Sequence, residues 1–151
     1  MLKEQAEMKT IPYEGPIEAI VLGLGPGELL LESIEKAIRV HDIRNGVVVS
    51  GIGTLKTCRM HYITHTDFPP QDAKFTLHEP LELVSMNGII ADGEPHLHAV
   101  VSQAEEGARG GHIEPGCEVA YLAEIVIHKY RYLRLMRRPH PDKMIKLLGP
   151  K

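Results

Sequence analysis

The pattern of apolar positions changes its period near residue 46. Residues 28–41 carry apolar side chains at helical spacing with charged residues opposite, which predicts an amphipathic helix after a short buried strand at 17–24. From Gly46 onward the apolar residues form strand-like runs, at 46–55, 58–64, 81–91, 95–103 and 117–136. The short connections between these runs favour antiparallel pairing, because parallel strands need long crossovers. The fold class predicted is therefore α+β, with a mainly antiparallel sheet.

Turn residues divide these runs. Asn45-Gly46 marks a turn, and Asp92-Gly93 is typical of a two-residue hairpin. Gly88 interrupts an apolar strand, which indicates a bulge or a close approach of two backbones. We expect residues 104–111 to form a loop, and the segment 137–151 to form a tail with a short helical turn.

Composition restricts the class of protein. The chain has 151 residues, enough for one domain, with 43% hydrophobic and 25% charged residues, which is typical of a soluble globular protein. The net charge of −3 argues against non-specific nucleic-acid binding, which depends on Lys and Arg. Basic residues nevertheless gather at 129–146, where we expect a solvated basic end and keep a nucleic-acid surface as the alternative.

The cysteine content and the polar N-terminal stretch indicate the cellular compartment of the protein. Two cysteines without a CxxC pair give no disulfide framework, so we expect reduced thiols. The sequence shows neither a secretory signal nor a run apolar enough for a membrane span. The cytoplasm is the expected location, without membrane association.

Three of the nine histidines lie in the stretch HLHAVVSQAEEGARGGH at 96–112. Side chains on a strand alternate between its two faces, so His96 and His98 point the same way. If the chain folds back through the loop, with its midpoint at residue 105, His112 returns close to His98. The spacing therefore predicts that three imidazoles converge.

Three imidazoles with one open position are the ligand set of catalytic zinc sites, although iron, copper and nickel also accept imidazole. Asp92, Glu94 and Glu114 are the nearby acids that could orient these rings or act as a base on metal-bound water. Two other interpretations stay open, exposed polar histidines and histidines packed at a subunit interface. His61 and His65 form a second, looser pair.

Three blocks of the sequence resemble the plants-and-prokaryotes-conserved (PPC) domain family. They are GELLLESIEKAIRVHDIRNGVVVSGIGTL, LELVSMNGIIADGEPHLHAVVS and GARGGHIEPGCEVAYLAEIVI, in the order of the family. The resemblance covers about residues 15–136, with 1–14 as a polar lead-in and 137–151 as a tail that packs on or trails the domain. The histidine blocks are its most diagnostic part.

The resemblance implies a single domain with an antiparallel sheet flanked by helices, assembled as a homotrimer. It also implies that His96, His98 and His112 are metal ligands, for zinc, in a protein whose biochemical role stays unresolved. Stand-alone members carry a DNA-binding label, so a DNA-associated regulatory module is the alternative function, and a metal-dependent hydrolase-type enzyme is a further one. Apolar strand residues are expected to contribute to the core or to the trimer interface: Val47, Val49, Leu83, Val119 and Tyr121.

The chain departs from the plant branch of the family in two places. Arg137-Arg138-Pro139 lacks the Gly-Arg-Pro core of an AT-hook, the motif that enters the minor groove in plant members. The segment Glu79–Val84 replaces the plant block Gly-Arg-Phe-Glu-Ile-Leu. The prokaryotic branch is therefore the better guide to this chain.

Overall fold

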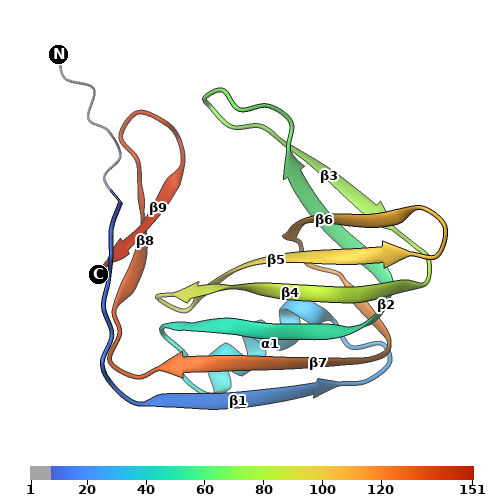
Figure 1. Ribbon diagram of the computed structural model, residues 1–151, viewed down its shortest axis with the longest axis horizontal. Helices are drawn as coiled ribbons and strands as arrows, with labels where there is room; N and C mark the ends of the chain where they lie inside the picture. The colour runs from blue at the N-terminus through green and yellow to red at the C-terminus, as the bar shows by residue number, and fades with distance from the viewer. Residues whose placement is uncertain (1–7) are drawn as a thin grey trace.

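Every strand pair is antiparallel in residues 8–151, which are the part of the chain that the computed structural model describes. The main sheet has the order β1-β7-β2-β4-β5-β6, and β3 pairs with β2 at one end (Figure 1). Its strands are β1 (Ile17–Leu24), β2 (Gly46–Ile63), β3 (Asp72–Leu77), β4 (Leu81–Ala91), β5 (Glu94–Gln103), β6 (Gly107–Ile113) and β7 (Glu118–Tyr130). The predicted antiparallel sheet is confirmed.

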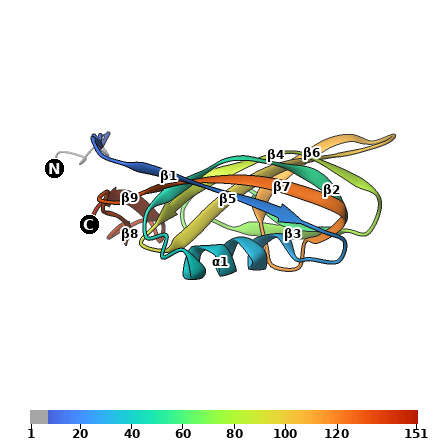
Figure 2. The same ribbon diagram turned by 90° about the horizontal axis from the view of Figure 1, so that it is seen from below.

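One helix, α1 (Leu30–Val40), packs on one face of this sheet. The helix buries Leu30, Leu31, Ile34, Ala37 and Ile38, whereas His41 is exposed after the last turn. No helix covers the opposite face in residues 8–151 (Figure 2), so the prediction of a sheet flanked by helices was wrong. The helix of the described residues is also too short to span a membrane.

The strand β2 is one continuous element of 18 residues, where the sequence predicted two strands. Register shifts against β7 between Gly53 and Thr57 let it bend without ending. Its first half pairs with β4 and β7, and its last residues pair with β3 and β6. Because β4, β5 and β6 also pair in succession, the ladder returns to β2 and closes on itself.

Two segments differ from their predicted structure. Most of the expected loop at 104–111 belongs to β6, because pairing with β5 outweighs the weak strand preference of its glycines. The tail forms a hairpin of β8 (Leu135–Pro139) and β9 (Lys146–Pro150) in place of a helical turn. Pro139 and Pro141 lack the N–H that a helix interior requires.

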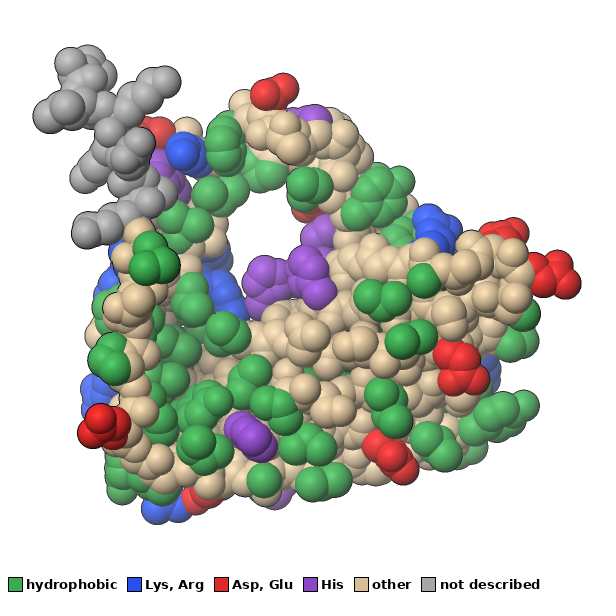
Figure 3. Space-filling model, in the orientation of Figure 1, with side chains coloured by type: hydrophobic (Ala, Val, Ile, Leu, Met, Phe, Trp, Pro, Cys, Tyr) green, Lys and Arg blue, Asp and Glu red, His purple; other side chains and the backbone are tan. Residues whose placement is uncertain are grey.

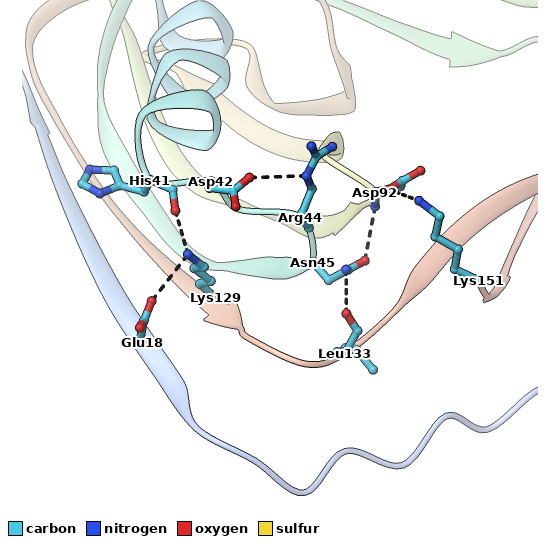
Figure 4. A network of polar contacts seen from close by, with 9 residues as sticks. All are labelled: Glu18, His41, Asp42, Arg44, Asn45, Asp92, Lys129, Leu133 and Lys151. Carbon is cyan, nitrogen blue, oxygen red and sulfur yellow. Dashed lines mark hydrogen bonds and ion pairs between the residues drawn. The ribbon is translucent and has the colours of Figure 1, made fainter.

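The side chain of Asn45 joins three separate segments (Figure 4). Its Nδ2 donates to the carbonyl of Leu133 at 2.6 Å, and its Oδ1 accepts from the N–H groups of Asp92 at 3.2 Å and Leu135 at 3.0 Å. Asn45 is only 5% exposed, so water cannot replace these bonds. It therefore holds the β4–β5 turn and the start of the β8–β9 hairpin against the end of the helix.

Replacing Asn45 by Ala is expected to lower the free energy of unfolding by about 1–3 kcal/mol, because buried donors and acceptors lose their partners. The measurement is urea unfolding at a fixed protein concentration. Asn87→Ala, at an exposed strand position, is the control and should change stability little. Equal stability of the two variants would contradict this role of Asn45.

Candidate metal centre

Three imidazoles converge on the face of the sheet that no helix covers. His96 and His98 lie on β5 and His112 on β6, and one ring nitrogen from each lies within 4.8 Å of the other two. The two Nε2 atoms of His96 and His98 are 3.2 Å apart. The structure thus brings together the three residues that the spacing predicted, and for the predicted reason, since β5 and β6 form a hairpin whose register pairs His98 with His112.

The distances between these nitrogens suit a metal ion. Two ligands at about 2.0–2.1 Å from a tetrahedral zinc ion lie about 3.3 Å apart, close to the Nε2–Nε2 distance. Two of the rings, those of His96 and His112, are shifted toward the neutral form that metal binding requires. Burial and the neighbouring His61 lower the pKa of His112 to about 4. Burial, His98 and Arg137 also lower the pKa of His96.

Two glycines permit the close backbone approach that this arrangement needs. A side chain at Gly111 would place its Cβ 2.5 Å from the carbonyl oxygen of His61, so the residue before His112 must be glycine for β6 to reach β2. A Cβ at Gly88 would collide with the carbonyl oxygen of His96. Gly88 is therefore a point of close approach, as predicted from its position in the strand.

A fourth histidine, which the sequence analysis paired with His65 instead, lies against the cluster. His61, on β2, is the register partner of His112 and stacks on its ring with centroids 4.4 Å apart. Its Nδ1 lies 2.6 Å from Oε1 of Glu114. The looser pairing expected with His65 does not form, because His65 lies in the β2–β3 loop and accepts from the N–H of Asp67.

Glu114 is the one of the three predicted acids that contacts this histidine cluster. Burial alone would raise its pKa, but the hydrogen bond with His61 and the charge of Lys74 lower it on balance. An ionised carboxylate can only accept, so Nδ1 of His61 carries the hydrogen. Asp92 and Glu94 instead line a hollow at the β4–β5 turn, where Asp92 binds Lys151 at 2.8 Å.

A hollow of about 390 Å³ opens beside His96 and His98. Its other wall comes from the β8–β9 hairpin, which contributes Arg137, Lys146 and Leu147. Figure 3 shows the histidines at the rim of an opening, with basic side chains beside them. The tail that the sequence left without a role thus forms part of the site.

Comparison with known proteins identifies a much longer protein that is similar to this chain over part of its length. Bifunctional protein GlmU from Synechococcus sp. (strain JA-3-3Ab) is 30% identical over 127 residues, which are 84% of this chain and 20% of that protein. The match to the same protein from strain JA-2-3B'a(2-13) has the same identity. The chain therefore spans about a fifth of the length of the curated relatives it matches.

Solved structures share the whole fold. A metal-containing protein from Archaeoglobus fulgidus has a TM-score of 0.79 at 24% identity, covering 94% of this chain and 99% of its own. A protein from Bacteroides thetaiotaomicron, whose name gives DNA binding as a provisional role, has a TM-score of 0.77 at 18% identity, covering 87% and 91%. A plant- and prokaryote-conserved (PPC) protein from Pyrococcus horikoshii has a TM-score of 0.71 at 25% identity, covering 93% and 99%.

The family assignment follows from the match of this chain to the model of one domain family. The model of the Plants and Prokaryotes Conserved (PCC) domain matches residues 11–131, most of the chain. These residues include all three histidines of the cluster. The chain belongs to the Plants and Prokaryotes Conserved domain family.

Proposed function

We propose that this chain is a metal-binding protein in which His96, His98 and His112 hold a zinc ion. The observation that carries the proposal is the convergence of three ring nitrogens within 4.8 Å, on two strands whose register fixes them. The metal-containing relative from Archaeoglobus fulgidus, which has the same fold, supports it. Zinc is preferred over calcium or magnesium because the ligand atoms are imidazole nitrogens and not oxygens.

The neighbouring residues prepare the site for this ion. Glu114 accepts from Nδ1 of His61, which fixes the ring of His61, and that ring stacks on His112. His61 and Glu114 are therefore positioning residues that limit rotation of the third ligand. Three protein ligands leave a coordination position free, at which zinc can lower the pKa of bound water to about 7. If the protein is an enzyme, a hydrolase-type activity that uses this zinc-bound water is the activity we propose.

The open sheet face supports assembly with further copies of the chain. Apolar side chains on it are exposed: Val21 at 71%, Val49 at 43%, Ile52 at 48% and Val84 at 51%. Exposed apolar patches of this kind mark interaction surfaces. Of the residues expected at an interface or in the core, Leu83 and Val119 are buried in the core, and Val49 and Tyr121 are exposed. We assign this face to a homotrimer interface, as the family resemblance implies.

The zinc site predicts about one zinc ion per chain in protein purified without a tag, measured by elemental analysis. His96→Ala combined with His98→Ala should abolish the zinc content, because a single imidazole remains. His65→Ala, in the β2–β3 loop, is the control and should keep the metal. Equal zinc in the parent and in the double variant would refute the assignment.

The trimer predicts a mass about three times the 16.8 kDa of one chain in sedimentation equilibrium. Val49→Lys combined with Ile52→Lys should yield monomers, because both side chains are exposed in one chain and charges are costly in a buried interface. Thr66→Lys, in an exposed loop, adds charge elsewhere and should leave the mass unchanged. A parent of monomer mass would contradict the proposal.

DNA association is the second candidate function, favoured by the relative from Bacteroides thetaiotaomicron. The basic segment supports it weakly, because two of its charges, at Lys129 and Arg131, have partners within the chain. Lys129 donates to the carbonyl of His41 at 2.7 Å, and Arg131 pairs with Glu18. Such engaged side chains have less freedom to neutralise phosphates.

We therefore expect weak binding of duplex DNA even at low salt, where the phosphate contribution is strongest. The measurement is fluorescence anisotropy of a labelled duplex at several salt concentrations. Submicromolar binding with a steep loss on adding salt would favour the DNA-associated function instead.

A further inference from the structure

The β8–β9 hairpin adds two cationic side chains to the hollow beside the histidines. Arg137 and Lys146 line this hollow together with His96 and His98. Neither cation was predicted to belong to the site, because both lie in the tail. Their presence adds two positive charges to a hollow that the histidines line on its other side.

Contacts with the sheet fix the guanidinium of Arg137. Its Nη1 donates to the carbonyl of Glu94 at 2.9 Å, and its Nη2 donates to the carbonyl of Ile89 at 2.7 Å. Ile89 is the register partner of His96 on the neighbouring strand, so the guanidinium lies beside the first ligand. A guanidinium has five N–H donors, and these two bonds leave three available.

These two cations form no ion pair within the described residues, although the charge of Glu94 acts on Arg137 from farther away. Among residues 8–151, no carboxylate oxygen lies within 4.0 Å of a side-chain nitrogen of Arg137 or Lys146. Arg137 is half-buried, where water screens its charge less than at the surface. A half-buried cation with free donors favours an anionic ligand, and planar guanidinium groups match carboxylate and phosphate oxygens.

We propose that the hollow binds a small molecule with an oxyanion group, either a carboxylate or a phosphate, as the substrate class of this site. Arg137 and Lys146 hold that group, and the rest of the molecule extends toward His96 and His98. The inference rests on the proposed function, because a metal ion at the histidines defines where the reacting end of the molecule lies. The two cations themselves do not depend on the metal.

The size and lining of the hollow set the size of the molecule. A volume of about 390 Å³ lies at the lower end of ligand pockets, which span about 300–1,000 Å³. Ile89, Leu147 and Leu148 add apolar side chains to the lining of the hollow. A short carbon chain that carries one acid group therefore fits better than a nucleotide.

The test is isothermal titration of the zinc-loaded protein with inorganic phosphate and with acetate, beside elemental analysis of zinc in every sample. We expect at least one probe to bind, and the tighter one identifies the acid group. Lys146→Gln and Arg137→Gln should each weaken binding by about tenfold, the usual effect of losing a charged hydrogen bond. Lys143→Gln is the matched control, since Lys143 lies in the same hairpin but over the ring of Phe68.

The outcomes separate this inference from the metal site. Zinc-loaded protein that binds neither probe, or that binds equally in Lys146→Gln and Lys143→Gln, overturns the anion pocket and leaves the metal proposal intact. If the parent protein contains no zinc, the metal proposal is overturned. Anion binding by Arg137 and Lys146 is then tested by the same titration of the metal-free protein. Arg137→Gln removes two hydrogen bonds that hold the hairpin, so this variant can unfold. In that case Lys146→Gln decides the result, because Lys146 is at an exposed position.

Discussion

The site depends on the pairing of one short strand, β6, with two neighbours at once. His112 lies in register with His98 of β5 on one side and with His61 of β2 on the other. The first pairing completes the three-imidazole cluster, and the second supplies the ring that stacks on His112. The second pairing requires Gly111, because a side chain there would collide with the backbone of β2.

The two faces of the sheet are covered unequally, and this explains the position of the histidine cluster. The helix α1 buries one face, and that face carries the core of the molecule. The other face presents the histidines together with exposed valine and isoleucine side chains. The histidine cluster and the exposed apolar side chains therefore share the face opposite the helix.

The C-terminal hairpin is held in place by polar contacts with the main sheet. Asn45 accepts from the N–H of Leu135, and Arg137 donates to two carbonyls of β4 and β5. These bonds bring Lys146 and two leucines to the hollow beside the strand that carries His96 and His98. The hollow beside the histidine cluster exists only because this hairpin is docked.

The sequence by itself determined the elements whose signals are local. The period of apolar residues identified α1 and most strands, and Asp92-Gly93 identified its hairpin, with positive φ angles at both residues. Strand alternation and a short return were enough to bring His96, His98 and His112 together, because two strands of one hairpin contain all three.

Only the tertiary structure decided the features that join distant segments. His61 is 51 residues from its partner His112, and Arg137 is 41 residues from His96 along the chain, and no local pattern encodes such pairings. The bend of β2, the strand character of 107–113 and the tail hairpin likewise depend on backbone hydrogen bonds to neighbours far away in sequence. Those bonds outweighed the weak local preferences of glycine and proline, which is why composition and spacing predicted loops and a helical turn there.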